Sequence, residues 1–95
     1  MTEEQENEIF EDALYYFGYN NQATKAIEEM SELIKELCKN KDGADNVDHI
    51  AEEIADVFIT LDQMVMYHDI LDRIAQYREQ KLERLRSLIF IEKHG

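Results

Sequence analysis

The feature that most constrains the fold is the near absence of helix-breaking residues. The 95-residue chain contains no proline and only three glycines, and its many glutamate, leucine, isoleucine, lysine and alanine residues favour the α-helix. Its length corresponds to a single domain, residues 1–95, and a hydrophobic content of 44% is that of a globular protein. We therefore expect an all-α domain with a modest core.

Apolar residues recur with helical periodicity in four segments that short breaks separate. The breaks are the turn after Gly18, the loop around Gly43 and the segment that ends at Asp69. The helices are predicted from about Glu3 to Tyr16, from Ala23 to Asn40, from Asp45 or Asn46 to Tyr67, and from a cap at Asp69 to Ile89. Short connections favour a four-helix bundle. Aromatic residues crowd the first helix, and a dimer or tetramer would cover them.

The charge balance excludes several classes of partner. With 22 acidic against 10 basic residues and a net charge of −12, the chain is not expected to bind nucleic acid, which requires neutralisation of phosphates. No apolar run approaches the length of a membrane span, and the amino terminus lacks the basic and apolar regions of a signal peptide. We therefore expect a cytoplasmic protein without a membrane partner, in which the single cysteine, Cys38, forms no internal disulfide.

Two pairs of acidic residues, each at a spacing of three, lie at the edges of apolar stripes. Glu29 and Glu32 flank the stripe of the second helix, and Glu53 and Asp56 flank that of the third. If these helices pack as an antiparallel pair, the four carboxylates converge. Carboxylate oxygens are hard ligands that suit Mg²⁺, with Mn²⁺ as the alternative.

A solvated acidic surface with local ion pairs is the competing interpretation. It suits the second helix, where Lys25 and Lys35 lie within four residues of the acidic pair. It fails for the third helix, because the nine acidic residues from Asp42 to Asp72 are accompanied by no lysine or arginine. Like charges held close together destabilise a fold unless a cation or a partner intervenes.

The fourth helix is basic, since six of the ten basic residues lie between Arg73 and Lys93. Arg78 and Lys81 fall inside its apolar sector rather than on its polar side. Long basic side chains often lay their stems on apolar surface and reach water with the charged group. The alternative is that Arg78 and Lys81 are directed toward the carboxylates or toward a bound phosphate.

The segments EEMSEL and EEIADV carry a resemblance to a known family. They resemble the E-x-x-E … E-x-x-D signature of the MazG-like all-α nucleoside triphosphate pyrophosphohydrolases, in their short phage- and Firmicute-type form. That superfamily also includes the dimeric dUTPases. FGYNNQ is similar to the family's FG-x-x-x-Q segment, and KLERLRSLI resembles its last-helix K-x-x-R motif. The resemblance covers roughly residues 17–89.

This resemblance implies an enzyme that cleaves a nucleoside triphosphate into a monophosphate and pyrophosphate. Its metal ligands would be Glu29, Glu32, Glu53 and Asp56, and either Glu28 or Glu29 would activate the attacking water. The substrate-binding residues would be Lys81, with Arg84 or Arg78, for the phosphates, and Gln22 for the nucleoside. Two alternatives remain open: a non-catalytic homologue that binds nucleotide and metal, and an acidic helical module that binds a basic protein.

Overall fold

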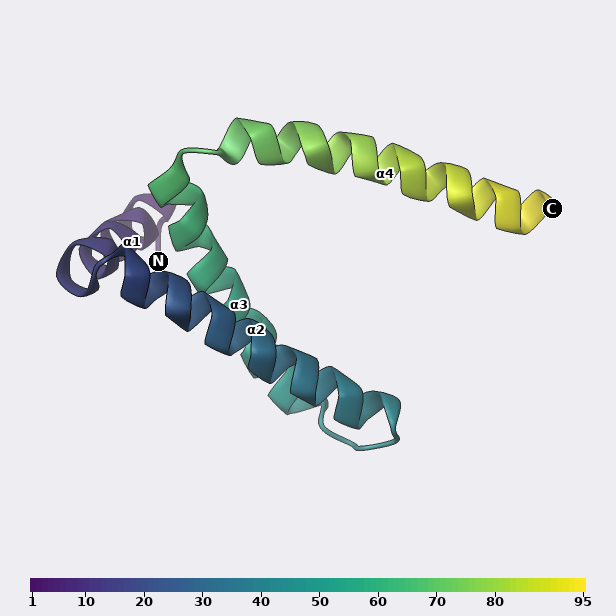
Figure 1. Cartoon of the computed structure of the whole chain (residues 1–95), viewed down its shortest axis with the longest axis horizontal. Helices are drawn as coiled ribbons and strands as arrows, with labels where there is room; N and C mark the ends of the chain where they lie inside the picture. The colour runs from purple at the N-terminus through teal and green to yellow at the C-terminus, as the bar shows by residue number, and fades with distance from the viewer.

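The computed structural model describes all 95 residues and contains four helices and no strands (Figure 1). The helices are α1 (Glu3–Phe17), α2 (Tyr19–Lys41), α3 (Val47–His68) and α4 (Leu71–His94). This confirms the prediction of an all-α chain with four helical segments. None of the helices is long and apolar enough to cross a membrane.

The centre of the molecule is a hairpin of α2 and α3, which run side by side along their length (Figure 1). A loop connects them, and Gly43 occupies it with a φ of 102°, a backbone conformation that glycine adopts without strain. Helix α1 packs against both α2 and α3 at the end of the hairpin where α2 begins. At that end the ring of Tyr19 stacks on Tyr67 with centroids 4.1 Å apart. Its hydroxyl also lies 2.9 Å from Nε2 of His68.

Helix α4 extends away from the other three as a separate arm that ends at the carboxyl terminus (Figure 1). Every residue from 71 to 95 is exposed, and the element has no buried residue. The predicted four-helix bundle is therefore not closed within one chain, where only α1, α2 and α3 pack together. The amphipathic pattern correctly predicted the helix, but such a pattern does not specify which surface covers it.

Most predicted boundaries differ from the observed ones by a few residues, for local reasons. Gly18 alone separates α1 from α2, because Asn21 fits into the first turn of α2 and donates a hydrogen bond to the carbonyl of Phe17 at 2.7 Å. Asp69 does not cap α4 as predicted; it ends α3 in the left-handed region, with φ 52° and ψ 52°. Helix α4 then begins after Ile70 and continues five residues beyond the predicted end at Ile89.

The contact between α2 and α3 is more polar than the sequence pattern suggested. The residues of α2 that are not exposed recur at spacings of three and four, and therefore form one side of the helix: Tyr19, Gln22, Ala23, Ala26, Glu29, Leu33 and Glu36. On α3 the buried residues are Val57, Thr60 and Gln63. Ala26 and Val57 are the only buried apolar residues of the chain.

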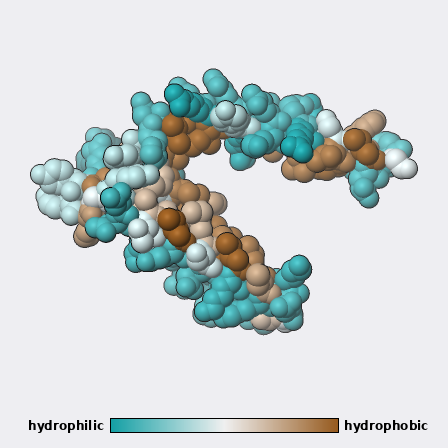
Figure 2. Space-filling view, viewed as in Figure 1, coloured by the Kyte–Doolittle hydropathy of each residue, from teal (hydrophilic) through white to brown (hydrophobic).

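The apolar stripe of α2 remains open to solvent. It lies about 100° around the helix from the α3 contact, and its members are between 38% and 62% exposed: Ile27, Met30, Ile34 and Leu37. An apolar stripe of this kind is expected to face the core, but in the single chain it is exposed. Figure 2 shows apolar surface on the hairpin and on α4 facing the open space between them.

Asn46 joins the loop of the hairpin to α2 through side-chain hydrogen bonds. This buried residue precedes α3 but does not cap it with its side chain. Its amide instead donates to the carbonyl and the carboxylate of Glu36, at 2.9 and 2.6 Å, and it accepts a hydrogen bond from Asn40 at 3.2 Å. The hydrogen bond from Asn46 lowers the pKa of Glu36, and the charge of Lys39 adds to this effect.

Replacement of Asn46 by alanine is expected to lower the melting temperature by roughly 4–8 °C, because the Glu36 and Asn40 groups lose their buried partner. The lowered pKa means that Glu36 contributes stability above its ordinary pKa and loses it as the pH falls through the lowered value. Thermal melts at neutral and acidic pH should therefore show the difference between the two proteins shrinking in acid. An equal melting temperature at neutral pH would exclude this role for Asn46.

Candidate metal site

Three carboxylates from the two hairpin helices converge on one point. Glu29 comes from α2, and Glu53 and Asp56 come from successive turns of α3. One oxygen atom from each lies within 4.8 Å of the other two, and all three residues are half-buried. The convergence follows from the local sequence, because a spacing of three places Glu53 and Asp56 on the same side of α3, opposite the side of α2 that contains Glu29.

The electrostatics of this cluster are unfavourable in the absence of a cation. Oε2 of Glu53 is buried and has no hydrogen-bond partner. Burial raises the pKa of Glu29, and the charges of Asp56 and Glu53 raise it further. The three salt bridges of the chain join Lys25 to Glu28, Lys39 to Glu36 and Arg86 to Glu83, so none of them neutralises the cluster. A carboxylate oxygen without water or a partner costs free energy, which a bound cation would recover.

The donor set fits a hard divalent cation. It consists only of carboxylate oxygens, which Mg²⁺, Mn²⁺ and Ca²⁺ prefer, and no histidine or cysteine belongs to the group. At metal–oxygen distances of about 2.1 Å, ligands of one Mg²⁺ ion lie about 3–4 Å from one another. Small side-chain rotations would therefore bring the three carboxylates onto one ion.

The two other acidic residues predicted for the site lie outside this group. Glu32 is exposed, because it lies about 80° around α2 from the line that faces α3. Glu28 is exposed as well, and its carboxylate lies 3.7 Å from Nζ of Lys25. The structure thus brings together three of the four predicted metal ligands, Glu29, Glu53 and Asp56.

The predicted substrate-binding residues divide between the hairpin and the arm. Gln22 lies on the same side of α2 as Glu29, and its amide donates a hydrogen bond to Oε1 of Gln63 at 2.7 Å. Arg78, Lys81 and Arg84 lie on α4 and are exposed. Since α4 does not pack on the hairpin, one chain alone does not place these cations beside the carboxylates.

The sequence analysis missed the polar residues that line the rest of the α2–α3 contact. Gln22, Glu29 and Glu36 follow one another at a spacing of seven, which places them on one side of a helix. Across the hairpin, Gln63 accepts a hydrogen bond from Gln22, and Asn46 donates one to Glu36. A polar residue at every seventh position was the available signal in the sequence. The neighbouring apolar stripe gave a stronger pattern, and the prediction followed that stripe instead.

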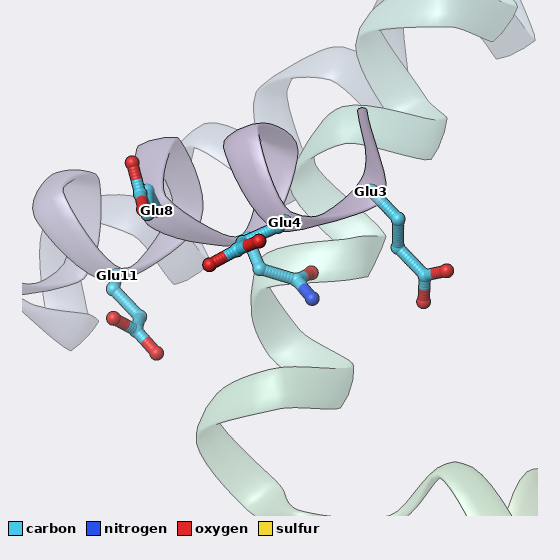
Figure 3. A pocket seen from close by; sticks show the side chains of 5 residues that line it. Glu3, Glu4, Glu8 and Glu11 are labelled. Atoms are coloured by element: carbon cyan, nitrogen blue, oxygen red, sulfur yellow. The ribbon is translucent and has the colours of Figure 1, made fainter. Parts of the chain in front are cut away.

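A second group of acidic residues lies on the outer face of α1 (Figure 3). Glu3, Glu4, Glu8 and Glu11 surround a shallow depression together with Asn7. All of them are exposed and belong to a single helix, and their side chains point into solvent in Figure 3. Only residues of α1 line this depression, so this face has the character of a solvated acidic surface.

Comparisons with protein-family models, curated proteins and solved structures find no match to this chain.

Proposed function

We propose that this chain is a magnesium-dependent nucleoside triphosphate pyrophosphohydrolase of the MazG-like all-α kind. The observation that carries the proposal is the convergence of Glu29, Glu53 and Asp56, together with a buried carboxylate oxygen of Glu53 that has no hydrogen-bond partner. These residues belong to the two segments on which the family resemblance rests. An ordinary acidic surface has no reason to bury carboxylates against one another.

In the proposed reaction Glu29, Glu53 and Asp56 hold Mg²⁺ or Mn²⁺. The bound cation would polarise the α-phosphoryl group and lower the pKa of the attacking water. The carboxylates fix the position of the site between two packed helices, so the triphosphate is oriented without rearrangement of the backbone. Gln22, on the same side of α2, would approach the nucleoside.

Glu29 is better placed than Glu28 to accept a proton from the attacking water. Glu29 lies between the helices, within hydrogen-bonding reach of Asp56 and Glu53, whereas Glu28 faces solvent beside Lys25. A general base must lie within hydrogen-bonding reach of the proton that it removes. The geometry therefore favours Glu29 for this role and leaves Glu28 as a surface residue.

Lys81, with Arg84 or Arg78, would offset negative charge on the departing pyrophosphate. Because α4 stands apart from its own hairpin, this part of the proposal requires a homo-oligomer in which another copy supplies the arm. The setting that we propose is the cytoplasm, where nucleoside triphosphates are abundant.

The test is release of pyrophosphate from a panel of canonical and modified ribo- and deoxyribonucleoside triphosphates, with Mg²⁺ and with EDTA. We expect release that depends on Mg²⁺ and is lost in EDTA. Binding of Mg²⁺ without any release would favour a non-catalytic nucleotide-binding homologue. If neither binding nor release occurred, the metal site would be excluded and an acidic protein-binding module would be the better reading.

A further inference from the structure

A pair of amide side chains lies two helical turns from the candidate metal site. Gln22 precedes Glu29 by seven residues on α2, and Gln63 follows Asp56 by seven residues on α3. A spacing of seven returns to the same side of a helix, about 10 Å along its axis. Because the two helices run in opposite directions (Figure 1), both amides lie at the same end of the carboxylate group. A nucleoside spans a comparable distance between its α-phosphate and the far edge of its base.

The orientation of the Gln63 amide is set by a backbone carbonyl. Gln63 is only 4% exposed, and its Nε2 donates a hydrogen bond to the carbonyl oxygen of Ile59 at 3.4 Å. A carbonyl oxygen can only accept hydrogen bonds, so the opposite orientation of the amide would bury two oxygen atoms against each other. Oε1 of Gln63 is therefore directed toward Gln22.

This orientation in turn fixes the amide of Gln22. Its Nε2 donates to Oε1 of Gln63 at 2.7 Å, which leaves its own Oε1 as the free end of the amide. That oxygen has no hydrogen-bond partner in the chain. It is open to solvent, because the oxygen of Glu53 is the single buried side-chain oxygen or nitrogen atom that lacks a partner. Gln22 thus offers an acceptor that no group of the chain occupies.

We infer that Gln63 is a positioning residue, which orients Gln22 so that the site selects bases with an exocyclic amino group. This selection rests on the proposed function, in which Gln22 approaches the nucleoside. The amino group of cytosine or adenine can donate to Oε1 of Gln22, whereas the oxo group that uracil or hypoxanthine carries in its place would bring two acceptors together. A glutamine whose amide could turn over would accept either group. The selection therefore depends on Gln63, although this residue need not touch the substrate.

The test compares nucleotides that differ at this group: dCTP with dUTP, and dATP with dITP. We expect the wild-type kcat/KM for Mg²⁺-dependent pyrophosphate release to favour the amino nucleotide of each pair by at least about 10-fold. In Gln63→Met the amide of Gln22 is free to turn over, so both ratios should fall to near one. A ratio of two rates from one preparation does not depend on the fraction that is folded, so a loss of stability alone would leave it unchanged.

Thr60→Val is the matched control. Thr60 is 5% exposed, lies one turn before Gln63 on α3 and donates its hydroxyl to the carbonyl of Val57 at 2.9 Å. Its replacement alters the same helix contact without changing either amide, so this variant should retain the wild-type ratios. Wild-type ratios near one, a preference for the oxo nucleotides, or ratios that Gln63→Met leaves unchanged would overturn the inference. Equal losses in Thr60→Val and Gln63→Met would do the same.

Equilibrium binding separates this inference from the proposed reaction. The α,β-imido analogues of the same four nucleotides resist cleavage between the α and β phosphates, so their dissociation constants in Mg²⁺ give the ratios without turnover. If no nucleotide released pyrophosphate while the affinities still favoured amino bases through Gln63, the reaction would be wrong and the selection would stand. If none of the analogues bound, the selection would be overturned.

Discussion

Replacing Glu53 with glutamine is expected to abolish Mg²⁺-dependent pyrophosphate release while leaving the helix content unchanged. Glu53 supplies the buried oxygen that has no partner in the chain, and an amide at this position loses the charge that holds a cation. Groups that merely orient a metal ligand contribute about 10–100-fold, so loss of a ligand should reduce the rate by more than about 100-fold. The measurement is pyrophosphate release at saturating Mg²⁺, together with circular dichroism.

Glu52→Gln is the matched control for this variant. Glu52 is the adjacent residue on the same helix, has the same side chain and is exposed. The two substitutions change the net charge of the chain equally, so a difference between them reports the position and not the total charge. Retained activity in Glu53→Gln, or equal losses in both proteins, would remove Glu53 from the site.

The second expected result is that Glu29→Gln stabilises the protein in EDTA and abolishes its stabilisation by Mg²⁺. Burial and the charges of Asp56 and Glu53 raise the pKa of Glu29 above its ordinary value of 4.5. The folded state therefore binds this proton more tightly than the unfolded state. It follows that the free energy of unfolding decreases as the pH rises from the ordinary pKa through the raised one.

In Glu29→Gln this pH-dependent decrease should disappear. In EDTA at neutral pH the variant should melt about 2–5 °C above the wild type, because the repulsion has been removed. In Mg²⁺ at about ten times its dissociation constant the wild type should gain roughly 1.4 kcal/mol, while the variant gains little. Thermal melts over a range of pH, with Mg²⁺ and with EDTA, measure both effects.

Glu28→Gln provides the comparison for these melts. Glu28 is exposed and lies beside Lys25, so its replacement should change the melting temperature little in either buffer. If Glu29→Gln behaved like Glu28→Gln, or were less stable than the wild type in EDTA, the three carboxylates would not be repelling one another. The metal site would then lose its electrostatic basis.

The helices were predictable because their determinants are local. A chain without proline continues each helix until a residue such as Gly18 or Gly43 interrupts it. The arrangement of the helices was less predictable, because it depends on which side of each amphipathic helix finds a partner. The periodicity of α2 identified its apolar stripe, yet the hairpin uses the neighbouring stripe through Ala26 and Leu33.

The candidate site was also only partly predictable from the sequence. A spacing of three correctly placed Glu53 and Asp56 together, and antiparallel packing brought Glu29 to them. Glu32 satisfies the same spacing rule but lies outside the group, because the line of contact runs through Gln22, Ala26 and Glu29 and leaves Glu32 on its solvent side. The spacing of two acidic residues defines their common side, and only the partner helix decides which of them is enclosed.

The scarcity of buried apolar residues has a consequence for how this chain acquires its structure. With Ala26 and Val57 alone enclosed, a single copy gains little from hydrophobic burial to offset the conformational entropy that its backbone loses. If a second copy covers the exposed apolar surfaces, as the proposed homo-oligomer requires, folding and association become one process, and the folded fraction falls on dilution. The abundance of the protein in its surroundings would determine how much of it is folded at any moment.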